Sequence, residues 1–153
     1  MLYEELQAEA ESYGVDVFEM VFRGNLKGMY KDNSIAIRID LKDQAEKACI
    51  LAEELGHFHT TVGNILDQRD IRKRKQELRA RQWAYERIIP LSAIVQAYEA
   101  KVKGRYEIAE YLNVTEEFLQ ASIDRYRDRF GILVSTENYI ILLDHLHVIR
   151  VSA

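Results

Sequence analysis

Residues 52 to 60 read Ala52-Glu53-Glu54-Leu55-Gly56-His57-Phe58-His59-Thr60, within a segment from about Lys42 to Thr61 that has the apolar spacing of a helix. The residues expected to form its buried stripe are Leu51, Leu55, Phe58 and Val62. At about 100° per residue, Glu53 and His57 fall about 40° apart on this helix and away from the stripe. Their side chains can therefore reach one cation from the same helix face.

The spacing matches that of the metal helix His-Glu-x-x-His, with a glutamate in the first position. In that motif two histidines four residues apart hold zinc, and the glutamate activates a water. Here Glu53 takes the first ligand position, Glu54 the position of the base and His57 the second ligand position. Carboxylate oxygen and imidazole nitrogen both bind zinc at about 2.0–2.2 Å, so the exchange is chemically tolerable. A helix face that binds no metal is the alternative, since acids and histidines share faces in many proteins.

A second long helix is predicted to lie close to the first. It runs from about Gln68 to Ile89, follows a loop around Gly63-Asn64 and ends at Pro90, the only proline. Gly56 costs about 1 kcal/mol inside a helix relative to alanine, which suggests close approach of another backbone or of a substrate. Glu77 heads a stripe of mostly small and apolar groups on the second helix, and can be a third metal ligand. Alternatively, Glu77 neutralises its basic neighbours on a solvated face.

Two segments then occur in a characteristic order. Ile50-Leu51-Ala52-Glu53-Glu54-Leu55-Gly56-His57 is followed by Glu77-x-x-Ala80-Arg81-x-Trp83-Ala84-x-x-x-Ile88-Ile89-Pro90. Together they resemble the ImmA/IrrE family of metallopeptidases, in which the second pattern is Glu-x-x-Ala-Asn-x-Phe-Ala-x-x-Leu-Leu-x-Pro. The resemblance covers roughly residues 15 to 130 and is closest to short members carried by phages and integrated elements.

The resemblance assigns a role to each residue of the site. It implies that His57 and Glu77 are zinc ligands and that Glu54 is the catalytic general base. Glu53 stands where the family usually has its first ligand histidine, so the first metal ligand of this chain would be a carboxylate. Arg81 for asparagine and Trp83 for phenylalanine are milder departures from the family pattern.

The resemblance also implies a fold and a function. The expected fold is α+β: a zincin-like domain with a small β-sheet, an active-site metal helix and a C-terminal helical lobe. Residues 1–100 would form the metallopeptidase core and residues 101–153 the lobe, or the whole chain a single domain. The expected function is that of a zinc-dependent endopeptidase which site-specifically inactivates a partner helix-turn-helix repressor, as phage and mobile-element anti-repressors do.

The remaining elements are read from periodicity and turn residues. Two segments are ambiguous between strand and helix, namely residues 15–22 and the apolar tail 132–151. In the second arm of the expected hairpin, Ile35, Ile37 and Ile39 alternate with polar or small residues, as in a half-buried strand. The other predicted elements are a helix over 2–13, a hairpin of 26–30 and 34–39, and helices over 91–101, 106–112 and 115–130.

Three more histidines have weaker metal-binding signals. His59 lies about 160° around the helix from His57, so the two cannot share one metal, and a half-buried or capping role is favoured. His145 and His147 would share one face if the tail is a strand. With no third ligand beside them in sequence, a structural role is favoured.

Composition narrows the class of protein. Of the 153 residues 48% are hydrophobic and 30% charged, which is typical of a globular domain. A single cysteine, Cys49, excludes an internal disulfide and suits a reducing cytoplasm. The N-terminus lacks the layout of a signal peptide, and no apolar run approaches the roughly 20 residues of a membrane span. We therefore expect a cytoplasmic protein without a membrane partner.

The charge distribution bears on the competing functions. The formal net charge of −4 argues against general nucleic-acid binding, although residues 69–81 hold seven bases and two acids. That basic stretch is a solvated helix face, a dock for an acidic partner or a nucleic-acid contact. Residues 108–119 have the pattern of a helix-turn-helix, but Glu116 and Glu117 would stand where a recognition helix meets DNA. A helix-turn-helix regulator and a catalytically inactive anti-repressor that acts only by binding are the two alternatives.

Overall fold

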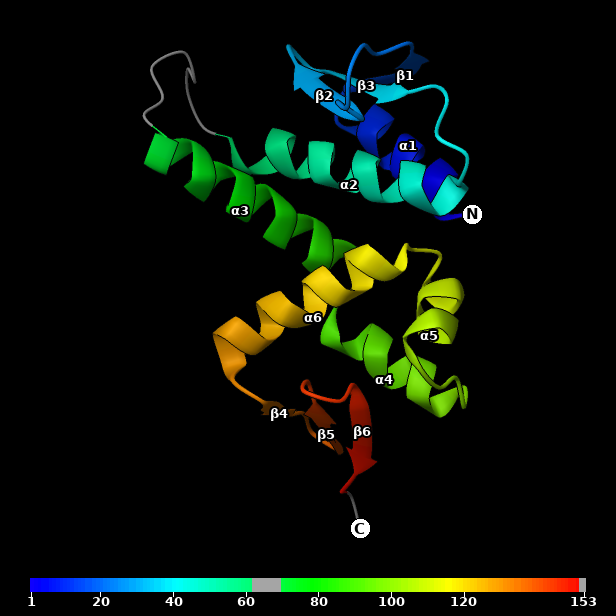
Figure 1. Cartoon of the computed structure of the whole chain (residues 1–153), viewed down its shortest axis with the longest axis vertical. Coiled ribbons are helices and arrows are strands. Elements are labelled where there is room, and N and C mark those ends of the chain that lie inside the picture. The colour runs from blue at the N-terminus through cyan, green and yellow to red at the C-terminus, as the bar shows by residue number, and fades with distance from the viewer. Residues whose placement is uncertain (62–69, 152–153) are drawn as a thin grey trace. The chain divides into compact units, whose positions relative to one another are not determined.

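The computed structural model describes residues 1–61 and 70–151 of the chain (Figure 1). The chain divides into two compact units, Met1–Arg87 and Ile88–Ala153. The assignment of residues 1–100 to a metallopeptidase core and 101–153 to a lobe, or of the whole chain to a single domain, stays a prediction. The loop expected around Gly63-Asn64 lies outside the described residues.

Unit 1 contains a three-stranded sheet whose central strand is the last of the three in sequence. Its strands are β1 (Asp16–Met20), β2 (Gly28–Lys31) and β3 (Ser34–Arg38), in the order β1-β3-β2. β2 and β3 form the predicted hairpin, and Asp32 and Asn33 adopt positive φ at its turn. β1 pairs with β3 in parallel, which leaves β2 at one edge of the sheet. Because β3 is central, Ala36 is buried as well as Ile35 and Ile37. Ile39 lies beyond the end of β3 and is exposed, contrary to the predicted alternation.

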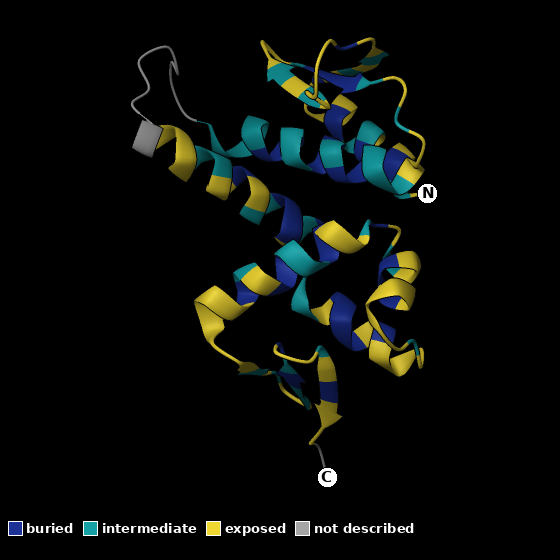
Figure 2. Cartoon of the chain, viewed as in Figure 1, coloured by how far each residue is buried: buried dark blue, intermediate teal, exposed yellow. Residues whose placement is uncertain are grey.

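Two helices, α1 (Leu2–Ser12) and α2 (Gln44–Thr60), pack against this sheet, and α3 (Asp70–Ile88) follows α2 in the chain. α1 packs against α2, and α2 against β2 and β3. Figure 2 shows buried and half-buried residues along α2, whereas residues 72–75 of α3 are exposed. The fully buried side chains that fill this core include Leu6, Val15, Ile35, Ile37, Leu51 and Leu55.

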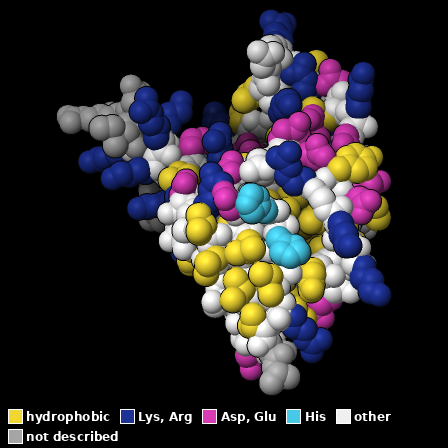
Figure 3. Space-filling view, turned by 60° about the horizontal axis from the view of Figure 1, so that its bottom comes forward, with side chains coloured by type: hydrophobic (Ala, Val, Ile, Leu, Met, Phe, Trp, Pro, Cys, Tyr) yellow, Lys and Arg dark blue, Asp and Glu magenta, His cyan; other side chains and the backbone are white. Residues whose placement is uncertain are grey.

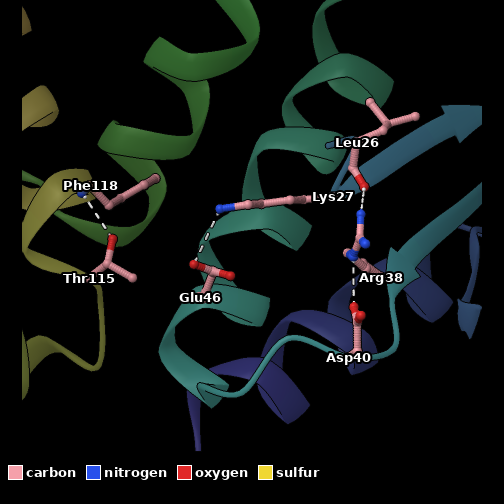
Figure 4. Close-up of polar contacts among 7 residues, drawn as sticks. All are labelled: Leu26, Lys27, Arg38, Asp40, Glu46, Thr115 and Phe118. Carbon is pink, nitrogen blue, oxygen red and sulfur yellow. Dashed lines mark hydrogen bonds and ion pairs between the residues drawn. The ribbon is translucent and has the colours of Figure 1, made fainter. Parts of the chain in front are cut away.

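The segment before β2 is fixed by one arginine (Figure 4). Arg38 donates from Nη1 to the carbonyl oxygens of Gly24 and Leu26, at 2.6 and 3.1 Å, and from Nε to Asp40 at 2.7 Å. Lys27 lies 3.5 Å from Glu46 on the first turn of α2. These contacts hold the start of β2 beside α2.

Unit 2 begins with helices and ends with strands. Its elements are α4 (Leu91–Glu99), α5 (Arg105–Leu112), α6 (Glu116–Phe130), β4 (Leu133–Ser135), β5 (Tyr139–Leu142) and β6 (His147–Arg150). α5 and α6 form the predicted helix-turn-helix, with Asn113 in the left-handed conformation and Thr115 accepting from the Phe118 amide (Figure 4). The Tyr126 hydroxyl donates to the Ile89 carbonyl at 2.7 Å.

The C-terminal lobe differs from the helical lobe predicted from sequence. The ambiguous tail forms an antiparallel sheet in the order β4-β5-β6. Val134, Ile141 and Val148 lie in one row of that sheet, and the last two are buried. Apolar side chains lie on both faces of these strands, so the sequence did not show the alternation of polar and apolar residues that identifies a strand. The α+β class is confirmed, and no helix among the described residues has the length and apolarity to cross a bilayer.

Candidate active site

The candidate site lies on the face of α2 between α3 and β2. Gly56 faces α3, because a Cβ built on it would lie 2.1 Å from the carbonyl oxygen of Ala80. Gly28 of β2 faces Glu54, because a Cβ on Gly28 would lie 3.2 Å from Cγ of Glu54. At about 100° per residue, Glu53 and His57 fall between these two directions on the helix.

The close approach predicted from Gly56 is therefore with the backbone of α3. Both residues at the contact, Gly56 and Ala80, are small and buried. Because the two helices are this close at Gly56, the neighbouring residue His57 lies beside Glu77 of α3. The Nε2 atom of His57 lies 3.4 Å from Oε1 of Glu77, while the His57 side chain is 21% exposed and that of Glu77 43%.

The spacing of His57 and Glu77 suits two ligands of one zinc ion. Ligands at about 2.0–2.1 Å in a tetrahedral site have donor atoms roughly 3.3–3.4 Å apart. The fit is limited to this pair: no three His, Cys, Asp or Glu side chains in residues 1–61 and 70–151 are grouped so as to hold a metal ion. The structure thus brings His57 and Glu77 together but does not gather Glu53 with them.

The two neighbouring glutamates of α2 lie in an environment that disfavours their charged forms. Burial, together with the carboxylates of Glu53 and Glu77, raises the pKa of Glu54 to about 7. Burial also raises the pKa of Glu53, although the guanidinium of Arg81 opposes this rise. A carboxyl group with a pKa near neutrality can take up and release a proton at physiological pH.

This shift predicts a pH-dependent stability for the metal-free protein. The folded state holds the Glu54 proton up to about pH 7, while the unfolded chain releases it near 4.5. The folded state binds more protons in this window, so the free energy of unfolding falls as pH rises through it. We expect Glu54→Gln to be more stable than wild type by about 2 kcal/mol at pH 8, and the gain to vanish below pH 4.5.

Urea unfolding with a chelator present, at several pH values, measures this difference. Glu11→Gln, which changes an exposed acid on α1, is the control and should show no pH-dependent gain. A Glu54→Gln gain that stays constant from pH 4 to 8 would contradict the assignment.

The other histidines have surroundings of their own. The ring of His59 stacks on Trp83 at 4.6 Å between centroids, and lies edge-on to Tyr13 at 4.7 Å and to Phe58 at 4.9 Å. Burial lowers the pKa of His59, which favours a neutral ring in this aromatic cluster. His147 is exposed at the start of β6, and His145 precedes that strand. The shared strand face, expected only if both lay in one strand, is therefore not formed.

The model of a known protein family matches the chain over the elements that build this site. That model, the IrrE N-terminal-like domain of Peptidase_M78, matches residues 10–124. The chain belongs to the IrrE N-terminal-like family. The family resemblance predicted from sequence is thereby confirmed, and membership points to a peptidase-like or anti-repressor role. No curated protein and no solved structure matches this IrrE N-terminal-like chain.

From the sequence, the hairpin around Leu26–Ile39 was expected to offer an edge strand to an extended substrate, but the approach of Gly28 to Glu54 was not predicted. Only the absence of a side chain at Gly28 hinted at it, and a glycine at the start of a strand is too common a feature to predict a particular neighbour. The geometry places an edge strand next to the candidate base, where a substrate's main chain could pair with it.

Proposed function

We propose that the protein is a zinc-dependent endopeptidase of zincin-like architecture that cuts a partner helix-turn-helix repressor. The observation that carries the proposal is the 3.4 Å contact between His57 and Glu77, on two helices, with Glu54 one turn before His57 on α2. His57 and Glu77 would hold the zinc, and Glu53 would complete the ligand set. The bound zinc would polarise the scissile carbonyl and acidify a water.

The residues around Glu54 support a proton-transfer role. Its pKa of about 7 allows Glu54 to accept a proton from the attacking water and to donate it to the leaving amine. The exposed edge of β2, which is paired only with β3 in the described residues, would hold the substrate main chain extended. Two anionic ligands reduce the electrophilicity of a zinc ion, which suits slow cleavage of one partner rather than digestion.

Metal analysis tests this proposal. Protein purified without chelator is expected to contain about one zinc per chain, and Glu77→Ala to lower that occupancy about tenfold or more, because a three-point clamp loses one ligand. Glu86→Ala, on the same helix, is the control and should keep the metal. Less than about a tenth of an equivalent after incubation with micromolar zinc would exclude the enzyme and leave an anti-repressor that acts by binding.

The glutamate in the first ligand position gives a second test. Glu53→His exchanges an anionic oxygen for a neutral nitrogen and should make the zinc more electrophilic. We expect this variant to retain zinc and to keep or raise peptidase activity, measured on the same substrate as wild type. Loss of zinc with an unchanged circular dichroism spectrum would show that Glu53 is not a ligand.

The helix-turn-helix of unit 2 does not favour a DNA-binding function. Residues 106–130 contain six acids and three bases, and Glu116, Glu117 and Asp124 lie on α6. A recognition helix with this charge would repel the phosphate backbone. A partner-binding role of unit 2 is more consistent with this surface.

A further inference from the structure

One face of α3 is basic next to the candidate site. Lys73, Arg74 and Arg81 line an open hollow together with Glu77 and Leu78. All three bases are exposed. At about 100° per residue the five side chains fall within an arc of about 140°, with Glu77 inside it. The bases therefore flank the residue that contacts His57.

Bases outnumber acids on α3, although the Arg81 guanidinium acts on the Glu53 carboxylate. Residues 70–88 hold seven bases and three acids, and Glu77 is the one acid among the described residues that line the hollow. In the described part of the chain, no ion pair joins Lys73, Arg74 or Arg81 to an acid. Figure 3 shows Lys and Arg side chains gathered at the left of the molecule, the side on which α3 begins in Figure 1. A cluster of exposed cationic side chains attracts a negatively charged partner.

We propose that this face binds an acidic segment of the polypeptide substrate, so that the enzyme selects substrates with carboxylates near the cleaved bond. The proposal rests on the proposed peptidase function and names the substrate class of the same site. The bases would bind the carboxylates of the segment. Leu78, which is 43% exposed at the edge of this arc, would contact its apolar side chains.

An acidic peptide fits this surface better than a nucleic acid does. Glu77 lines the basic hollow and lies 3.4 Å from His57, and Glu53 stands one turn before His57 on α2. A phosphate backbone carries a charge at every nucleotide and would be repelled by these acids. A peptide can place neutral residues at the acids and its own carboxylates at Lys73 and Arg74.

Binding to an uncut probe tests the proposal. The probe is a short fluorescent peptide with a run of glutamates between leucines, and the comparison peptide has glutamines in their place. Both are titrated into Glu54→Gln protein, so that turnover does not interfere. The charge reversal Lys73→Glu/Arg74→Glu is compared with Lys75→Glu/Arg79→Glu, which changes the net charge equally on another face of α3.

We expect the first double variant to weaken binding of the acidic peptide about tenfold or more, and the second by about threefold or less. The glutamine peptide should bind weakly to every variant, and added salt should remove the preference for the acidic peptide. Equal losses in the two double variants, or equal binding of the two peptides, would overturn the proposal. Tighter binding of duplex DNA than of the acidic peptide, abolished by Lys73→Glu/Arg74→Glu, would overturn it in favour of a nucleic-acid contact.

This test is independent of the test of the peptidase itself. Zinc content and fragment formation are measured on separate samples with the Glu54 carboxylate intact. Absence of cleavage there contradicts the proposed enzyme, whereas absence of charge selectivity in the titration contradicts only the substrate class.

Discussion

Glu54→Gln is expected to leave the protein folded, zinc-bound and able to bind its partner repressor, yet unable to cut it. The amide keeps the shape of the side chain against Gly28 but cannot accept the proton of the attacking water. Loss of a general base should slow cleavage by about 10²-fold or more. The measurement is mass spectrometry of a co-expressed repressor after incubation with wild type or variant.

The matched control for this experiment is Glu11→Gln, an exposed acid-to-amide change on α1, which should cut like wild type. The contradicting result would be equal relief of repression by wild type and Glu54→Gln, with no fragments from either. That outcome would identify an anti-repressor that works by binding alone.

Gly56→Ala is expected to destabilise the protein, although helix propensity alone predicts the opposite sign. Alanine favours a helix interior over glycine by about 1 kcal/mol. The added Cβ, however, would lie 2.1 Å from the carbonyl oxygen of Ala80, and a backbone atom cannot rotate away. The two helices must separate, so we expect a net loss of about 2 kcal/mol or more in the free energy of unfolding, together with weaker zinc binding.

Urea unfolding and zinc titration measure both effects. Gly14→Ala is the comparison, because Gly14 has φ of +75° but no atom within 4 Å of the added Cβ. It should cost about 1 kcal/mol through its left-handed backbone and leave zinc affinity unchanged. A stabilised Gly56→Ala protein would show that α2 and α3 are not in contact at this position.

Local sequence signals predicted much of this fold. The hairpin was predicted from its two arms, 26–30 and 34–39, and the positive φ of Asp32 and Asn33 is the property that suits these residues to the turn between them. The two long helices were predicted from the spacing of their apolar residues, and Pro90 predicted where the second one ends. Gly56 pointed to the close helix contact before its partner, Ala80, was known.

Non-local features could not be predicted in this way. The parallel pairing of β1 with β3 joins strands that are not neighbours in sequence, and no turn residue encodes it. The tail formed strands because tertiary packing selected one of two conformations open to an apolar run. In the site, spacing placed Glu53 and His57 on one face, but whether a third side chain joins a pair depends on distances that a helical wheel does not contain.

The packing of Gly56 on Ala80 also bears on how the protein would respond to metal starvation. Because Gly56 lies directly against the backbone of Ala80, the two helices proposed to carry the zinc ligands meet without a metal to join them. Small zinc modules, in contrast, unfold when chelated. We therefore expect zinc depletion to silence this protein without destroying it, so that activity returns on resupply without new synthesis.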